Sequence, residues 1–191
     1  NRELGLAKNE KIIALLPGSR KQEITKILGV MTTIIDSFPE YRFVIAGTSN
    51  IDQSLYRQLA PCVDIVIDQT YYLVRYADAA IVTSGTATLE TALLKTPQIV
   101  CYKTSPLSFA IAKRIVKLPF ISLVNLVLNR LLIKELIQGE CNQTELKYSL
   151  QKILSKNSRK AILSGYDELI EKLGGKGASE KVASLIHKRT H

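Results

Sequence analysis

The sequence predicts an α/β protein, a Rossmann-like doubly wound parallel sheet followed by a helical C-terminal tail. Short apolar runs alternate with longer amphipathic stretches, which is the pattern of βα units around a parallel sheet. The 191 residues are enough for one ordinary domain, and 46% hydrophobic with 23% charged residues is typical of a globular protein. We therefore expect one domain over residues 1–191, with residues 144–191 as the helical tail.

Each expected strand is a short apolar run that ends near turn-forming or polar residues. The first run, 12–16, stops at Pro17 and Gly18, and the fourth runs into Ser84, Gly85 and Thr86. The expected strands are 12–16, 42–47, 63–68, 79–83, 98–102 and one near 120–123.

Each expected helix shows apolar residues at helical spacing or follows a capping residue. In the first, Ile24, Ile27, Leu28 and Met31 share one face, and Asp52 is a suitable N-cap for the second. The expected helices are 21–37, 52–59, 72–76, 87–95, 107–117, 131–136, 144–154, 159–173 and 178–187.

Composition excludes several kinds of chemistry. Both histidines, His187 and His191, lie in the last five residues, which argues against a Ser-His-Asp triad, a histidine-ligated zinc or a histidine base in the core. The three cysteines form neither a CxxC motif nor a disulfide framework, and they fit a reducing compartment. We expect no metal and no bound cofactor. No apolar run is long enough for a membrane span.

The net charge of +9 predicts an anionic partner, and part of the charge is concentrated. From Thr91 to Lys134 there are seven basic residues and no acidic one. Two interpretations stay open for this segment: an amphipathic element on an anionic membrane surface, or a solvated rim around a buried helix. Tyrosines 71, 72 and 76 have a single basic residue among them, Arg75, and no helix-turn-helix, RRM or KH signature accompanies them, so nucleic-acid binding is not expected.

The turn after the first strand is the first candidate for ligand binding. Gly18 allows close approach of the backbone, Ser19 offers a hydroxyl, and Arg20 carries a planar guanidinium suited to phosphate. The turn lacks the GxxxxGK[ST] pattern of a P-loop. It can also be read as an ordinary strand-to-helix turn.

The turn after the fourth strand is the second candidate. Ser84, Gly85 and Thr86 precede a helix, whose N-terminal amides and dipole favour an anion such as a diphosphate. Glu90, one turn further on, is placed to accept hydrogen bonds from sugar hydroxyls, or it is simply a favourable first-turn acid. Because ligands of such sheets bind beyond the carboxyl ends of the strands, we expect both turns to share one diphosphate ligand.

A third group of polar residues follows the sixth expected strand. Asn125 stands within an apolar run, where a buried amide must be hydrogen-bonded, and it can also serve only to hold a turn. Glu135 and Gln138 are three residues apart, so within a helix they would share a face and reach one pocket.

Four segments together resemble a known family. They read LLPGSRKQEI, SGTATLETALLKTPQIVCYK, FAIAKRIVKLPFISLVNL and LLIKELIQGEC, in this order. Their order and spacing are similar to the C-terminal half of the lipid-A-disaccharide synthases, which are inverting glycosyltransferases of GT-B architecture. The resemblance covers about residues 8–145. The first two segments occur in looser form in other GT-B enzymes, whereas the last two are more specific.

The resemblance implies a hexosyltransferase reaction in lipid A (lipopolysaccharide) synthesis of Gram-negative bacteria. The family transfers 2,3-diacylglucosamine from its UDP donor to 2,3-diacylglucosamine 1-phosphate and releases UDP, at the cytoplasmic face of the inner membrane. In GT-B enzymes the C-terminal domain holds the UDP-sugar, no metal is normally needed, and the N-terminal domain brings the acceptor and usually the base. The family can also form dimers that exchange the C-terminal tail.

By position, the resemblance implies roles for the candidate residues. Arg20 would contact the diphosphate in a loop shaped by Gly18 and Ser19, and Asn125 and Arg20 would be the residues important for activity. Ser84, Gly85 and Thr86 would supply contacts at the helix start, and Glu90, Glu135 and Gln138 would line the uridine-ribose side. The family's Pro before the Asn is Val124 here, and its following Ala-Gly-Arg reads as residues 127–130, VLNR.

The chain begins with Asn1 rather than Met, so we expect a piece of a longer protein, one that binds UDP and does not catalyse transfer by itself. Two other functions stay open. One is the donor half of another UDP-GlcNAc-type transferase or 2-epimerase, although the lack of a core histidine argues against an epimerase. The other is a non-catalytic nucleotide or anionic-lipid binding module.

Overall fold

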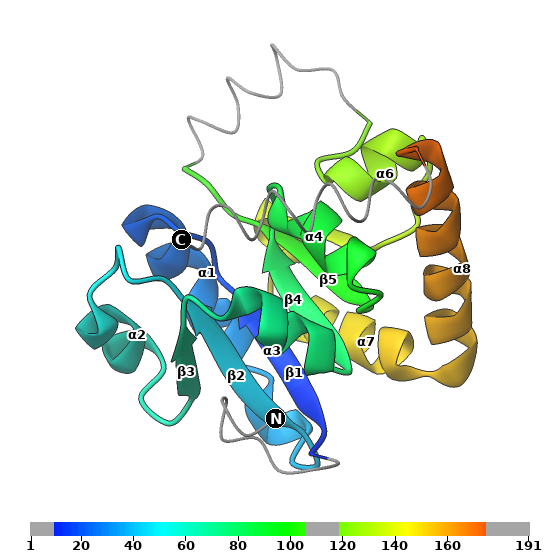
Figure 1. Cartoon of the computed structure of the whole chain (residues 1–191). Helices are drawn as coiled ribbons and strands as arrows, with labels where there is room; N and C mark the ends of the chain where they lie inside the picture. Colours follow the sequence, from blue (N-terminus) through cyan, green and yellow to red (C-terminus); the bar gives the residue numbers. More distant parts are fainter. Residues whose placement is uncertain (1–9, 106–118, 175–191) are drawn as a thin grey trace.

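Six parallel strands form the single sheet of the computed structural model, which describes residues 10–105 and 119–174 (Figure 1). The order across the sheet is β3-β2-β1-β4-β5-β6, which confirms the doubly wound α/β prediction. The strands are β1 (Ile12–Leu16), β2 (Arg42–Gly47), β3 (Asp64–Ile67), β4 (Ala79–Thr83), β5 (Gln98–Tyr102) and β6 (Glu135–Ile137).

Helices cover both faces of the sheet, and in the view of Figure 1 α3 lies in front of it and α1 and α7 lie behind. Seven α-helices and two 3₁₀ turns lie in the described ranges. They are α1 (Lys21–Thr32), η1 (Ile35–Ser37), α2 (Gln53–Leu59), α3 (Thr70–Tyr76), α4 (Ala87–Leu93), α6 (Leu123–Leu128), η2 (Gln138–Glu140), α7 (Gln143–Leu154) and α8 (Lys156–Lys172).

The sheet divides the core into two layers, as β1 shows, because successive side chains of a strand point to opposite faces. Ile13 and Leu15 join the larger cluster, which includes apolar residues of α1, α7 and α8. Ala14 and Leu16 join the smaller cluster, with Leu73 of α3. All five residues of β1 are buried, which explains why its sequence is continuously apolar.

Two expected elements are wrong, and both lie between β5 and α7. Residues 120–123 are not a strand: α6 begins at Leu123, and Ser122 Oγ accepts a hydrogen bond from Asn125 N. Residues 131–136 are not a helix, because Glu135–Ile137 pair with β5 as an edge strand. Three residues show no period of their own, so only pairing with β5 identifies β6.

The first helix is shorter than expected. The expected range 21–37 divides into α1, which ends at Thr32, and the 3₁₀ turn η1. At this end Thr32 and Thr33 donate side-chain hydrogen bonds to the carbonyls of Gly29 and Val30, at 3.0 and 2.7 Å, a contact that competes with helix continuation. The expected helices at 107–117 and 178–187 lie outside the described residues.

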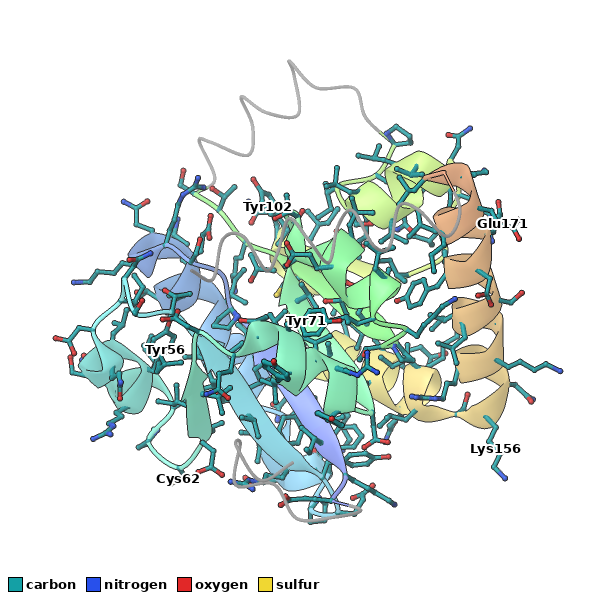
Figure 2. All side chains as sticks on the ribbon, in the orientation of Figure 1. Tyr56, Cys62, Tyr71, Tyr102, Lys156 and Glu171 are labelled. Atoms are coloured by element: carbon teal, nitrogen blue, oxygen red, sulfur yellow. The ribbon has the colours of Figure 1, made fainter. Side chains whose placement is uncertain are left out.

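The described part of the helical tail packs on its own domain. Leu146 and Leu150 of α7 and Tyr166 and Leu169 of α8 are fully buried in the larger core cluster. Lys156 and Glu171 mark the two ends of α8 along one side of the molecule (Figure 2). Exchange of the tail between subunits stays a prediction. Among the described residues, no helix has the length and apolarity to cross a membrane.

Candidate functional site

The turns after β1 and β4 lie next to each other at the carboxyl edge of the sheet. These strands are neighbours, with Leu16 paired to Val82, yet the chain leaves β1 toward β2 and β4 toward β5. This is the point at which the strand order reverses, where α/β sheets of this kind bind ligands. The sequence placed both candidate turns at this edge, and the structure brings them together.

A hollow of about 380 Å³ separates the two turns. Every ligand-binding residue that the sequence predicted in these two turns lines this hollow. The lining consists of Leu16, Gly18, Ser19, Arg20, Glu23, Ala46, Thr48, Thr70, Thr83, Ser84, Gly85, Thr86, Ala87 and Glu90. Residues from β1, β2 and β4 and from the starts of α1, α3 and α4 thus meet at one site, of a size suited to a small-molecule ligand.

The β1–α1 turn depends on a glycine. Gly18 has a φ of +103°, and a Cβ there would lie 2.6 Å from Glu23 Oε2, so no other residue fits without displacing Glu23. Glu23 in turn accepts a hydrogen bond from Arg20 Nη1 at 3.2 Å. The Arg20 side chain is nevertheless 82% exposed. Its guanidinium is therefore held near the hollow and remains accessible to an anion.

The β4–α4 turn presents backbone N–H groups. Those of Gly85, Thr86 and Ala87 have no hydrogen-bond partner among residues 10–105 and 119–174. By contrast, the Ser84 hydroxyl donates to the carbonyl of Ile121 at 3.0 Å, and the Thr88 hydroxyl donates to that of Gly85 at 2.8 Å. The main chain of this turn, more than its hydroxyls, is thus arranged for an acceptor such as a phosphate oxygen.

Two threonine hydroxyls on the wall of the hollow lack a partner in the described structure. Thr83, at the end of β4, is only 7% exposed, and its Oγ1 makes no hydrogen bond. The Thr48 Oγ1 atom, just after β2, is also buried and makes no hydrogen bond within the described residues. An unpaired buried hydroxyl costs about 1–3 kcal/mol, so a ligand that reaches these atoms gains from them. Thr48, Thr70 and Thr83 were not predicted from the sequence, although a polar residue at the end of a strand is a signal that marks Thr48 and Thr83.

Asn125 lies outside this hollow, fully buried within α6. Its Nδ2 donates to the carbonyl of Ile133 and to Glu135 Oε1, both at 2.8 Å, and its Oδ1 accepts from the N–H groups of Leu132 and Ile133 at 2.9 and 3.0 Å. The amide is fully used inside the protein. A role of Asn125 in activity stays a prediction, and in this geometry it would act by holding the segment between α6 and β6.

Glu135 and Gln138 also bind protein groups and do not line the hollow. Glu135, 7% exposed, accepts hydrogen bonds from the N–H groups of Ile121 and Ser122 at 3.0 and 2.9 Å. Gln138 accepts from Thr104 N at 2.9 Å and donates to Thr104 O at 3.3 Å. The expected shared helix face is wrong, because Glu135 is in β6 and Gln138 begins η2. These side chains connect β6 to the loops beside it.

The departures from the family motif are accommodated in α6. Val124 is fully buried in its first turn, and Leu128 packs in the core. The helix ends at Asn129, which has a left-handed conformation with a φ of 52°. In the described parts of the chain, no three His, Cys, Asp or Glu side chains are grouped so that they could hold a metal ion.

Solved structures that share this fold include glycosyltransferases and UDP-GlcNAc 2-epimerases. WaaG, a glycosyltransferase involved in lipopolysaccharide biosynthesis, matches with a TM-score of 0.57 at 16% identity, over 97% of this chain and 49% of that one. The UDP-GlcNAc 2-epimerase from Neisseria meningitidis matches with a TM-score of 0.55 at 17% identity, over 96% and 45%. The fold is therefore that of one half of a GT-B-type protein.

The sequence identifies the family. The lipid-A-disaccharide synthetase family model matches residues 1–188, and this chain belongs to that family. The lipid-A-disaccharide synthase of Syntrophus aciditrophicus is 40% identical over 96% of this chain and 51% of its own length. That of Synechocystis sp. is 34% identical over 96% and 50%. The chain thus spans about half the length of these curated relatives.

Proposed function

We propose that this chain is the donor-binding half of a lipid-A-disaccharide synthase, and that the hollow between the β1–α1 and β4–α4 turns holds UDP. One observation carries the proposal. The exposed guanidinium of Arg20 and the N–H groups of Gly85, Thr86 and Ala87, which have no partner in the described part of the chain, converge on one hollow at the reversal of strand order. Both kinds of donor suit a diphosphate, and family membership points to a UDP-sugar.

In the proposed reaction, the O6 hydroxyl of 2,3-diacylglucosamine 1-phosphate attacks C1 of the UDP-linked 2,3-diacylglucosamine. The bond from C1 to the diphosphate oxygen breaks with inversion, a β-1,6 bond forms, and the hydroxyl proton passes to a base. Negative charge develops on the leaving UDP, where Arg20 and the α4 N-terminal amides would stabilise it without a metal. Gly18 and Ser19 would shape the phosphate loop, and Glu90 would lie on the ribose side.

The base and the acceptor-binding surface are assigned to the other half of the protein. In this proposal the isolated chain binds UDP and transfers no sugar. Both substrates carry acyl chains, so the whole enzyme would work as a peripheral protein on the cytoplasmic face of the inner membrane. The net charge of +9 is favourable for an anionic surface.

The direct test is titration calorimetry of UDP with the wild-type chain, Arg20→Ala and Arg57→Ala. Arg57 is an exposed arginine on α2 outside the hollow, so its removal is a control for the loss of one positive charge. We expect Arg20→Ala to weaken binding by about 1.5–3 kcal/mol, the range for a hydrogen bond to a charged group, and Arg57→Ala to have little effect. Equal UDP affinity of the Arg20 variant and the wild type would contradict the proposed site.

A further inference from the structure

A second hollow of about 430 Å³ adjoins the first on the side of α1. It shares Arg20 and Glu23 with the proposed donor site. Its other lining residues come from two separate segments. They are Lys21, Gln22 and Lys26 of α1 and Lys103 and Thr104 after β5.

The charge of this second hollow is strongly positive. Four cationic side chains and only one carboxylate, that of Glu23, line it. This carboxylate already pairs with Arg20 at 3.2 Å. Lys21, Lys26 and Lys103 form no ion pair within residues 10–105 and 119–174. Lys21 also lies near Asp52, although the lowered pKa of that carboxyl is due first to hydrogen bonds from Ser54.

Other basic residues of the acid-free segment behave differently. Lys95 pairs with Asp167, Arg130 with Glu168 at 2.7 Å, and Lys134 with Glu140 at 3.4 Å. Among the described bases of this segment, Lys103 alone has no carboxylate partner. The three bases that pair with a carboxylate lie outside the second hollow, whereas Lys103 lines it.

The loop that carries Lys103 is hydrogen-bonded to the start of η2. The main chain of the next residue, Thr104, is held in both directions by the Gln138 side chain, at 2.9 and 3.3 Å. On the opposite wall, Lys21 and Lys26 belong to the twelve-residue helix α1, whose N-terminal end adds a positive potential. The lysines therefore lie on α1 and on a loop that is hydrogen-bonded to Gln138, and both line one hollow.

We infer that this hollow is a second phosphate site, distinct from the UDP site, which binds a phosphate monoester or diester through Lys21, Lys26 and Lys103. Three ammonium groups supply the charge and the donors that a phosphate group needs. The inference rests on this hollow alone and holds whether or not UDP binds next to it. Two sources carry the same chemistry: a soluble sugar phosphate, and the headgroup of an anionic lipid.

The test uses ³¹P line broadening of glucose 1-phosphate by the chain, with and without saturating UDP. Lys26→Ala with Lys103→Ala removes two ammonium groups of the hollow. The control, Lys147→Ala with Lys160→Ala, removes two exposed lysines of α7 and α8 and changes the net charge equally. Thermal melting of each variant establishes that it is folded.

We expect saturable binding that persists with UDP present, weakens about tenfold or more in the Lys26/Lys103 variant, and changes less than about twofold in the control. Three results would overturn the inference: no saturable binding, equal loss in both variants, or complete displacement by UDP. The last would make the hollow part of the donor site, and absence of UDP binding alone would count only against the proposed function.

Vesicle sedimentation then separates the two sources. Vesicles of phosphatidylcholine with phosphatidylglycerol are compared with vesicles of phosphatidylcholine alone. If the Lys26/Lys103 variant binds the anionic vesicles less than the control variant does, the phosphate belongs to a lipid headgroup. If both variants bind the anionic vesicles equally while the Lys26/Lys103 variant alone has weaker affinity for glucose 1-phosphate, the source is a soluble phosphate.

Discussion

Side chains near the carboxyl edge of the sheet perform two different tasks. Arg20 and Thr83 face the hollow, whereas Asn125 and Glu135 hold the loops around α6 through hydrogen bonds of 2.8–3.0 Å. Sequence could predict Arg20, because a guanidinium after a strand-ending glycine is a local pattern. It could not separate a binding Asn from a structural one, because the partners of Asn125 lie up to ten residues away and only the fold brings them together.

Replacing Asn125 with alanine should mainly destabilise the fold. The variant leaves the N–H groups of Leu132 and Ile133 without their acceptor and removes one donor to the buried Glu135, and we expect a loss of about 3 kcal/mol in the free energy of unfolding. Urea denaturation followed by circular dichroism measures this loss.

The control for this variant is Asn142→Ala, which removes an exposed N-cap of α7 and should cost about 1 kcal/mol. UDP affinity of the folded Asn125→Ala protein should stay close to that of the wild type. A variant with nearly normal stability and no UDP binding would show instead that Asn125 contacts the ligand.

Thr83→Val should separate stability from binding. The hydroxyl of Thr83 is buried without a partner, so its replacement by a methyl group should leave unfolding free energy unchanged or raise it. UDP affinity should fall by about 0.5–1.5 kcal/mol, since the ligand loses one hydrogen bond.

Thr91→Val is the matched control, because Thr91 Oγ1 is also buried and unpaired but lies outside the hollow. Its effect on stability should be similar and its effect on UDP affinity negligible. Calorimetry and thermal melting of both variants measure the difference. If both variants bind UDP as the wild type does, the hydroxyl of Thr83 is not a ligand contact.

At the scale of elements, local pattern was sufficient for the strands inside the sheet and for the last two helices, although it extended α1 beyond its end at Thr32. The strands β1, β2, β4 and β5 and the helices α7 and α8 lie close to their expected ranges. Pattern failed at β6, whose three residues become a strand by pairing with β5, from Val100 opposite Glu135 to Tyr102 opposite Ile137. Such a strand is determined by its neighbour and not by its own sequence.

Two glycine variants test whether the β1–α1 turn is tied to the site. Gly18→Ala forces an L-residue to a φ of +103° and pushes on Glu23, so we expect a loss of about 1–2 kcal/mol in stability and weaker UDP binding. Gly29→Ala, inside α1 with no atom within 4 Å of its new Cβ, should stabilise by about 0.5–1 kcal/mol and leave binding unchanged.

Urea denaturation and UDP calorimetry of the two variants provide the comparison. Gly18 and Gly29 lie in or beside the same helix, so a general effect of adding a methyl group would appear in both. A Gly18→Ala protein as stable as the wild type, with normal UDP affinity, would show that this turn tolerates a side chain and does not shape the site.

At the scale of the whole molecule, the chain has the fold of one half of a GT-B-type protein. The match to the Syntrophus aciditrophicus protein covers 96% of this chain but only 51% of that relative. Two hollows that share Arg20 lie at the carboxyl edge of the sheet, and residues of α1, α7 and α8 form the larger core cluster together on one face of the strands. The binding of UDP at the strand-order reversal is the central claim.

The most direct test of this claim is mapping of UDP on the ¹⁵N-labelled chain by amide chemical-shift changes. We predict saturable changes that are largest at Gly18, Ser19 and Arg20 and at Gly85, Thr86 and Ala87, the two turns that line the hollow. No saturable change, or changes centred on a surface such as the exposed side of α8, would contradict it.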